Sequence, residues 1–148
     1  MTIFVDADAF PNVLKEILLR FVLKRGICTR FIANKKITIP DVAFISMEIA
    51  PQGVDEADHL IAFTCKEKDI VITADIPLAD RIVAKGAIGL DPRGTIYTME
   101  NIKGLLAMRN LMQELRDGGE ITGGPSAIGE KEKRAFADAL NALLQKYT

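Results

Sequence analysis

Two kinds of apolar pattern alternate along the 148-residue chain. Short runs rich in β-branched and aromatic residues are typical of strands, and longer stretches with an apolar residue every three or four positions are typical of helices. The pattern predicts strands at 2–7, 27–33, 42–50, 69–75 and within 87–94. It predicts helices at 11–26, 55–68, 76–86, 99–119 and about 130–146, with Pro11 suited to starting the first and Gly26 to ending it.

This alternation indicates an α/β fold in which a mostly parallel sheet is sandwiched by helices. The length is that of one domain. We expect a single domain over 1–148, with a core at about 1–118, a Gly-rich joint at 118–129 and an added C-terminal helix at about 130–146. The joint would let the last helix pack either on the core or on a second copy of the chain, which would form a homodimer.

Composition narrows the class of protein further. Apolar residues make up 49% of the chain, but no apolar stretch approaches the roughly 18 residues that a membrane helix needs. The sequence therefore predicts a soluble, cytoplasmic protein without a membrane partner. Cys28 and Cys65 lie far apart and form no C-x-x-C motif, so we expect each to be a small core residue rather than part of a disulfide or zinc site.

Charge is unevenly distributed, although the net charge is only −1. Residues 1–40 carry seven Lys or Arg and three acids, residues 41–98 carry five and ten, and residues 99–148 carry seven of each. A basic first third suits polyanion binding, and an acidic middle third suits cation binding. The overall balance is not that of a strong nonspecific nucleic-acid binder, so the charge permits a phosphate substrate without requiring one.

Acidic residues are concentrated where the predicted strands end. Asp6 and Asp8 end the first strand, and Asp75 ends the strand at 69–75. Ligands of open α/β sheets bind outside the carboxyl ends of the strands. Asp6 and Asp8 would face the same way if the extended conformation continued past the strand. Asp58 lies near the start of a predicted helix and borders its apolar face, where an acid needs a partner.

Acids gathered at one edge of a sheet repel one another, and a bound divalent cation is the simplest compensation. Oxygen ligands suit Mg²⁺ or Mn²⁺, which activate water and neutralise charge on a phosphodiester. A single Asp at a helix start, such as Asp55 or Asp75, is explained equally well as an N-cap. For Asp6, Asp8, Asp58 and Asp75 together, a metal site that hydrolyses phosphate esters is the better interpretation.

Three arginines are candidates for binding a substrate phosphate, because a guanidinium group can donate two hydrogen bonds to it. Arg81 follows Asp80 on a predicted helix, Arg93 lies in "DPRG", and Arg109 interrupts an otherwise apolar stretch. An ordinary turn arginine or a salt bridge to an acid explains each of them equally well. The single His59 cannot build a multi-His metal site.

Several longer stretches resemble a known bacterial family. The stretches "VDADAFP", "VDEADHLIA", "DIVITADIPLADRIVAKGA", "DPRGTIYTMENI" and "LLAMRNLMQELRDGGEITGGP" are similar to conserved parts of the YaiI/YqxD family. The resemblance covers nearly the whole chain, and its "ITADIPLADR" block is highly specific. The family usually has Cys before the proline of its first motif, whereas this chain has Phe10, so the resemblance implies no catalytic thiol there.

A wider resemblance implies an activity. An Asp ending the first strand, an acid in a middle helix and "T-x-D-x-x-L" before a small-residue helix are similar to PIN-like nucleases, in which such acids bind the metals that cut RNA. The resemblance implies a PIN-like domain with Asp6, Asp58 and Asp75 as catalytic metal ligands and Asp80 as a fourth ligand. Asp8 is an addition to that pattern, either binding metal or orienting Asp6. The implied substrate is RNA rather than DNA.

Two other functions also fit Asp6 and Asp8 at the end of the first predicted strand. An apolar strand ending in D-x-D also resembles haloacid-dehalogenase phosphatases, in which Asp6 would be the nucleophile and Asp8 the general acid and base. However, the matching hydroxyl and lysine motifs are not in clear order, and no cap insertion follows Asp8. The third interpretation is a metal-binding or RNA-binding module without turnover. A metal-dependent nuclease remains the main hypothesis.

Overall fold

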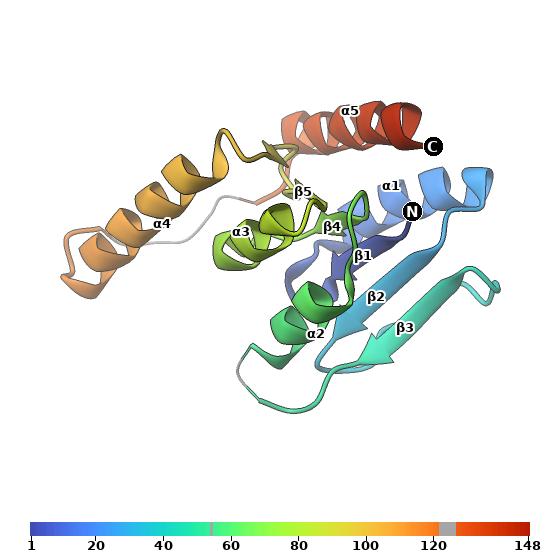
Figure 1. Ribbon diagram of the computed structural model, residues 1–148, viewed down its shortest axis with the longest axis horizontal. Coiled ribbons are helices and arrows are strands. Elements are labelled where there is room, and N and C mark those ends of the chain that lie inside the picture. Colours follow the sequence, from blue (N-terminus) through green and yellow to red (C-terminus); the bar gives the residue numbers. More distant parts are fainter. Residues whose placement is uncertain (54, 122–126) are drawn as a thin grey trace.

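The computed structural model, which describes residues 1–53, 55–121 and 127–148, has a six-stranded sheet with helices on both faces (Figure 1). The strand order is β3-β2-β1-β4-β5-β6. Strands β1 to β5 run parallel, and β6 is antiparallel to β5. The predicted α/β class, with a mostly parallel sheet between helices, is therefore confirmed. No helix in the described ranges is long and apolar enough to cross a membrane.

The bounds of the elements follow the predicted ranges closely. The strands are β1 Ile3–Asp6, β2 Thr29–Ala33, β3 Ile45–Ile49, β4 Ile70–Ile72, β5 Ile88–Leu90 and β6 Ile96–Tyr97. The α-helices are α1 Asn12–Arg25, α2 Glu56–Thr64, α3 Ile76–Ala84, α4 Ile102–Asp117 and α5 Glu130–Tyr147. A 3-10 turn, η1 at Ala7–Ala9, follows β1. The short strand β6 was not predicted, because two residues are too few to show an alternating pattern.

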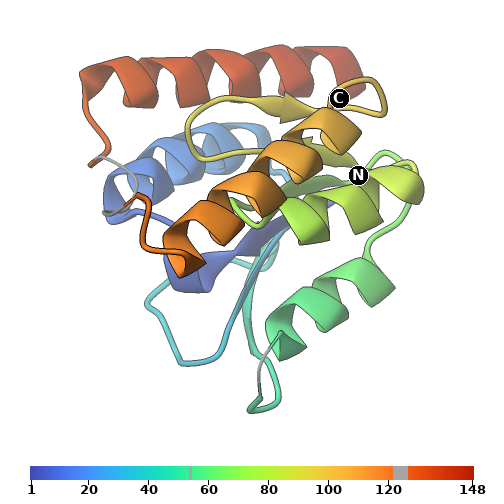
Figure 2. The same cartoon turned by 90° about the vertical axis from the view of Figure 1, so that its left-hand side faces the viewer.

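Each face of the sheet has its own hydrophobic core, because the central strand β1 sends alternate side chains to opposite faces. Ile3 and Val5 pack with residues of α1 and α5, whereas Phe4 packs with residues of α2, α3 and the start of α4. All three side chains are at most 2% exposed. Figure 2 shows α1 and α5 on one side of the sheet and α2 and α3 on the other.

The helix ends show how local sequence sets the boundaries. Helix α1 follows Pro11 and ends at Gly26, whose φ of 65° is the left-handed conformation that glycine adopts readily. The predicted C-terminal helix is confirmed as α5, whose Phe136, Leu140 and Leu144 are fully buried in the core beside α1. Part of the predicted Gly-rich joint, residues 122–126, lies outside the described residues.

The two cysteines differ in their environment. Cys65 is buried as expected, but Cys28 is exposed, so the predicted core position is wrong for Cys28. Its neighbours Ile27 and Thr29 are both buried, and side chains alternate in direction along an extended segment, so the side chain of Cys28 points outward.

The order of the strands defines where a ligand can bind. From β1 the chain passes through α1 to β2, on one side of β1, whereas β4 lies on the other side and is reached through α2. The connections therefore diverge between β1 and β4, and the carboxyl ends of these two strands border the crevice in which open α/β sheets bind ligands. Asp6 ends β1, and Thr73 to Asp75 follow β4.

Candidate functional site

Four acidic residues gather at the carboxyl ends of β1 and β4, and we call them the acidic cluster: Asp6, Asp55, Asp58 and Asp75. Asp6 is the last residue of β1, and Asp75 precedes α3. Asp55 and Asp58 lie at the start of α2. One carboxylate oxygen from each of Asp55, Asp58 and Asp75 lies within 4.8 Å of the other two, close enough for the three to share one cation.

Asp75 has a structural role as well as a place in the acidic cluster. Its Oδ1 accepts a hydrogen bond of 3.0 Å from the backbone N–H of Leu78, which makes it the N-cap of α3. The capping interpretation is thus confirmed for Asp75. A carboxylate has two oxygens and about four lone-pair positions, so capping leaves capacity for a further ligand.

Asp55 belongs to the acidic cluster, although an N-cap explained its place in the sequence equally well. It precedes α2, but its side chain makes no cap hydrogen bond, so the capping interpretation is wrong here. Its φ of 63° is a left-handed conformation that residues other than glycine rarely adopt. Asp55 and Asp58 are three residues apart, a spacing that brings side chains together at a helix start. That spacing was the signal available in the sequence.

Thr73 connects the two strands at the acidic cluster. Its Oγ1 donates a hydrogen bond of 2.8 Å to Oδ2 of Asp6 and accepts one of 2.9 Å from the backbone N–H of Asp75. The side chain of Thr73 is only 1% exposed, so this bridge is held inside the protein. Thr73 therefore orients Asp6 relative to Asp75. This positioning role was not predicted, because it depends on β1 and β4 being neighbours.

Two carboxyl groups of the acidic cluster, those of Asp6 and Asp58, hold protons more tightly than ordinary acids. Burial raises the pKa of Asp6; the hydrogen bond from Thr73 opposes this shift, and the charges of Asp75 and Asp8 add to it. For Asp58, burial, a hydrogen bond with Asp75 and repulsion from nearby acids raise the pKa to about 7. The charged groups that shift Asp58 are all acidic, so the cluster carries surplus negative charge.

Asp8 lies apart from the acidic cluster. The extended conformation stops at Asp6, because η1 begins at Ala7, so the condition under which Asp6 and Asp8 would face the same way is not met. The Asp8 carboxylate instead accepts hydrogen bonds from Asn34, from the backbone N–H at 2.9 and 3.0 Å and from Nδ2 at 2.8 Å. Asp8 therefore ties η1 to the end of β2 and acts on Asp6 through its charge.

Two other acids near the same edge already have partners. Asp80 on α3 accepts a hydrogen bond of 2.9 Å from Nζ of Lys103 on α4, and it does not belong to the group of oxygens around Asp58. Asp91 follows β5 and accepts hydrogen bonds from the Tyr97 hydroxyl at 3.0 Å and from the backbone N–H of Arg93 at 2.6 Å. The structure therefore groups Asp6, Asp58 and Asp75 but places Asp80 beside α4.

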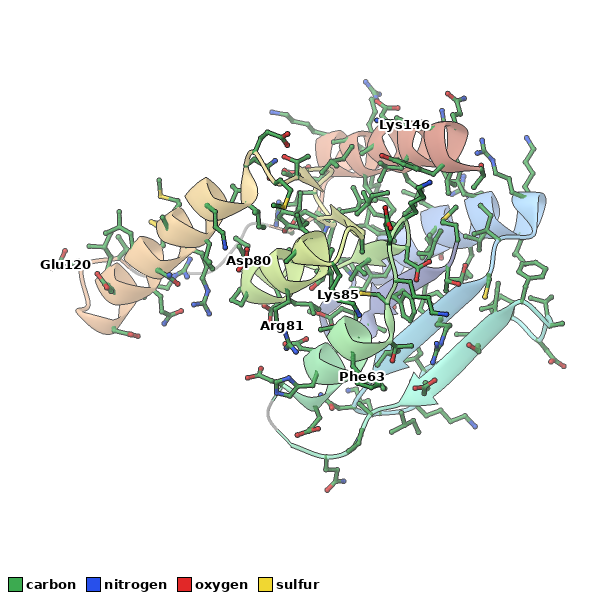
Figure 3. The ribbon with its side chains drawn as sticks, viewed as in Figure 1. Phe63, Asp80, Arg81, Lys85, Glu120 and Lys146 are labelled. Atoms are coloured by element: carbon green, nitrogen blue, oxygen red, sulfur yellow. The ribbon has the colours of Figure 1, made fainter. Side chains whose placement is uncertain are left out.

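The three candidate arginines lie on different elements. Arg81 on α3 contacts His59 on α2, with 3.0 Å between Nη1 and Nδ1, and is exposed (Figure 3). Its partner His59 is the residue next to Asp58, so Arg81 is the arginine that the structure ties most directly to the acidic cluster. Nη1 of Arg93 lies 3.7 Å from a carboxylate oxygen of Glu132 on α5. Arg109, exposed on α4, donates to the side chain of its neighbour Asn110.

Comparisons with known proteins give relatives but no structural neighbour. Residues 4–146 match the family described as "Uncharacterized BCR, YaiI/YqxD family". The chain is 54% identical over 146 residues to a "UPF0178 protein" of Sulfurovum sp. (strain NBC37-1), with 99% of each chain covered. It is 49% identical over 146 residues to a "UPF0178 protein" of Maridesulfovibrio salexigens, covering 99% of this chain and 97% of the relative. No solved structure matches it.

Proposed function

This chain belongs to the YaiI/YqxD family, and we propose that it is a divalent-metal-dependent nuclease that hydrolyses phosphodiester bonds in RNA. One observation carries the proposal. The acidic cluster brings Asp55, Asp58 and Asp75 within 4.8 Å of one another beside Asp6, and burial together with mutual repulsion raises the pKa of Asp58 to about 7. A bound cation would offset the repulsion among these carboxylates and so favour their ionised form.

The donor set fits Mg²⁺ or Mn²⁺. All four side chains of the acidic cluster offer carboxylate oxygens, the hard ligands that these ions prefer, and the cluster contains no soft sulfur ligand. Asp6, Asp58 and Asp75 are the ligands that the PIN-like resemblance implies, and Asp55 is a further ligand suggested by its position. Asp8 and Asp80 are less suited because of their position: Asp8 lies against Asn34 and Asp80 against Lys103, outside the group of oxygens formed by Asp55, Asp58 and Asp75.

Each residue has a defined part in the proposed hydrolysis. When bound, the divalent ions lower the pKa of water and neutralise negative charge on the phosphate. Asp6, Asp58 and Asp75 would hold the metal, and the hydrogen bond from Thr73 fixes the Asp6 carboxylate toward β4. In the reaction a water oxygen bonds to phosphorus and one ester oxygen leaves. The water loses a proton to solvent, and the leaving oxygen gains one, so the reaction balances.

The preference for RNA rests on the resemblance to PIN-like nucleases. We propose that Arg81 contacts a phosphate of the chain, because it is exposed and lies next to the residue that follows Asp58. Arg93 and Arg109 are proposed as more distant phosphate contacts. An RNA substrate is in keeping with the predicted cytoplasmic location, which stays a prediction.

Cleavage of labelled single-stranded RNA tests the proposal. We expect wild-type protein to cut the RNA with Mn²⁺ or Mg²⁺ but not with EDTA. Asp6→Asn should lower the rate by about 100-fold or more, since losing one metal-binding carboxylate removes several kcal/mol of transition-state stabilisation. The Asn carbonyl can still accept the hydrogen bond from Thr73, so the fold should survive.

The matched control is Asp138→Asn, the same change at an exposed position of α5. It should cleave at the wild-type rate. Cleavage that persists in purified Asp6→Asn would exclude the proposed site. The phosphatase alternative predicts instead that beryllofluoride, a mimic of phosphate on the nucleophile Asp6, binds wild type but not the variant. A module without turnover predicts Mn²⁺ or RNA binding with no cleavage.

A further inference from the structure

Helix α4 presents an apolar face that the described residues leave largely uncovered. Of its 16 residues only Ile102 is buried, while Met108 is 57% exposed and Leu111 is 49% exposed. Figure 1 shows α4 projecting beyond the end of α3, and Figure 3 places Glu120 at the far end of this projection. Exposed large apolar residues on one helix mark an interaction surface.

The geometry of a helix defines this surface. With 3.6 residues per turn, six small or apolar residues fall within an arc of about 140°. We call them the α4 face: Gly104, Ala107, Met108, Leu111, Met112 and Leu115. Ile102 and Lys103 lie outside the arc and hold α4 to the body, since Ile102 is buried and Nζ of Lys103 binds Asp80 of α3 at 2.9 Å. The α4 face therefore points away from α3.

A projecting helix of this length needs a packing partner. Isolated helices of about 12 to 15 residues are marginal in water, and most helical stability in proteins comes from packing of an apolar face. Ile102 is buried and Leu105 packs against the core, but from Ala107 onward every residue of α4 is exposed or half-exposed. The described residues therefore supply little packing for the far part of the helix, and a second molecule can provide it.

We propose that the α4 face pairs with the same face of a second copy of this chain in antiparallel orientation. Its six positions are symmetric about the midpoint between residues 109 and 110, as a two-fold axis requires. Around that axis Gly104 lies opposite the partner's Leu115, Ala107 opposite the partner's Met112, and Met108 opposite the partner's Leu111. Small residues thus meet large ones in two of these three pairs, which favours close packing.

Charge supports the antiparallel orientation over the parallel one. Lys103 near the start of α4 and Glu114 near its end lie on the same flank of the α4 face. Nζ of Lys103 has three N–H donors and gives one to Asp80 of its own chain, so an antiparallel partner can place its Glu114 carboxylate beside the same ammonium group, and the two-fold axis repeats this contact. The antiparallel orientation also aligns the two helix dipoles favourably. One helix pair buries less than the roughly 1,600 Å² of a standard interface, so we expect a dissociation constant in the micromolar range.

Sedimentation velocity and light scattering over about 1 to 500 μM test the pairing, since dimer formation depends on concentration. The mass should rise from 16.2 kDa toward twice that value. Leu111→Glu should weaken association by about 100-fold, because it buries a charge in the α4 face. Asn110→Glu is the matched control: it adds the same side chain one residue away, outside the α4 face, and should dimerise as the wild type does.

A charge change at the exposed Glu114 tests the orientation and leaves the contact between Lys103 and Asp80 in place. Glu114→Lys should weaken the dimer by about three- to tenfold, because it places an ammonium group beside the partner's Lys103, whereas the neutral Glu114→Gln should weaken it by less. A wild type that stays monomeric throughout, or a Leu111→Glu variant that dimerises normally, overturns the proposal. A Glu114→Lys variant that associates as tightly as the wild type overturns the antiparallel orientation.

Discussion

At Asp58, burial and neighbouring acids both oppose the ionised form of the carboxyl group. Burial raises its pKa to about 7 in the folded protein, whereas an ordinary Asp has a pKa of 3.8. The folded state therefore holds a proton on Asp58 that the unfolded state releases between these two values. Since the folded state binds more protons there, stability falls as the pH rises from about 4 to about 7 and then levels off.

We predict that Asp58→Asn changes the pH dependence of stability when EDTA keeps the site free of metal. The amide carries no charge at any pH, so this variant should lose less stability than wild type between pH 4 and pH 8. At pH 8 we expect it to be the more stable of the two proteins. Urea unfolding at a series of pH values measures the difference. The raised pKa of Asp6 acts in the same direction, so some pH dependence should remain in the variant.

The control for this prediction is Asp138→Asn, which changes an exposed acid on α5. Its unfolding curve should shift with pH as that of wild type does. A variant Asp58→Asn that keeps the full pH dependence would mean that the Asp58 carboxyl ionises as freely in the folded protein as in the unfolded one.

Single residues of the acidic cluster were partly predictable from the sequence. Asp6, Asp58 and Asp75 could be found because strand ends and helix starts are visible in the apolar pattern. Asp55 was missed because a residue preceding a helix is usually a cap, and only the left-handed backbone of Asp55 frees its side chain. The direction of Asp8 depended on whether the strand continued past Asp6, and nothing in the pattern marks the switch from β1 to the tight turn η1.

At the scale of elements, the turn at Gly94 determines how closely α5 approaches the sheet. Gly94 has a φ of 98°, and a Cβ added there would lie 2.7 Å from the carbonyl carbon of Ala135 in α5. Gly26 at the end of α1 also has a positive φ, of 65°, but a Cβ there would meet no atom within 4 Å. Comparing variants at these two glycines therefore separates the cost of a strained backbone from the cost of close packing.

We predict that Gly94→Ala destabilises the protein more than Gly26→Ala. Both variants force alanine into the left-handed region, which costs about 1 kcal/mol. Gly94→Ala must also displace α5 or the turn, which adds about 1 to 3 kcal/mol. The free energy of unfolding from urea titration measures both. Equal losses in the two variants would show that α5 does not press against this turn.

Elements were predicted well where their apolar pattern is long enough to read. The helix predicted at 11–26 corresponds to α1 at Asn12–Arg25, because Pro11 and Gly26 mark its ends. The helix predicted at 55–68 stops at Thr64, since Cys65 is already extended. The strand β6 and the projection of α4 depend on contacts between distant segments, which the local pattern does not contain.

At the scale of the whole molecule, the strand order turns scattered acids into one site. The pattern along the chain indicates parallel strands, but it does not state that β1 and β4 are neighbours. Their pairing places Asp6 beside Thr73, which is 67 residues away in the sequence. The start of α2 then brings Asp55 and Asp58 to the same edge. The site is thus a product of topology, and the sequence supplied only its candidates.

The acidic cluster joins these segments, so a bound cation should stabilise the whole fold. A ligand at 100 times its dissociation constant stabilises the folded state by about 2.7 kcal/mol. For a chain of this size we predict that saturating Mn²⁺ raises Tm by about 5 to 10 °C. Because the cation displaces the proton of Asp58, the rise should be larger at pH 8 than at pH 5. Thermal denaturation with Mn²⁺ or EDTA measures it.

Variants determine whether this stabilisation arises at the acidic cluster. Asp58→Asn should lose most of the Mn²⁺-dependent rise in Tm, whereas Asp138→Asn should keep all of it. An equal rise in both variants would place the cation elsewhere on this chain of net charge −1. If Mn²⁺ stabilises the wild type through Asp58 and yet no RNA is cut, the metal has a structural role. The stability measurement therefore tests the metal site separately from its chemistry.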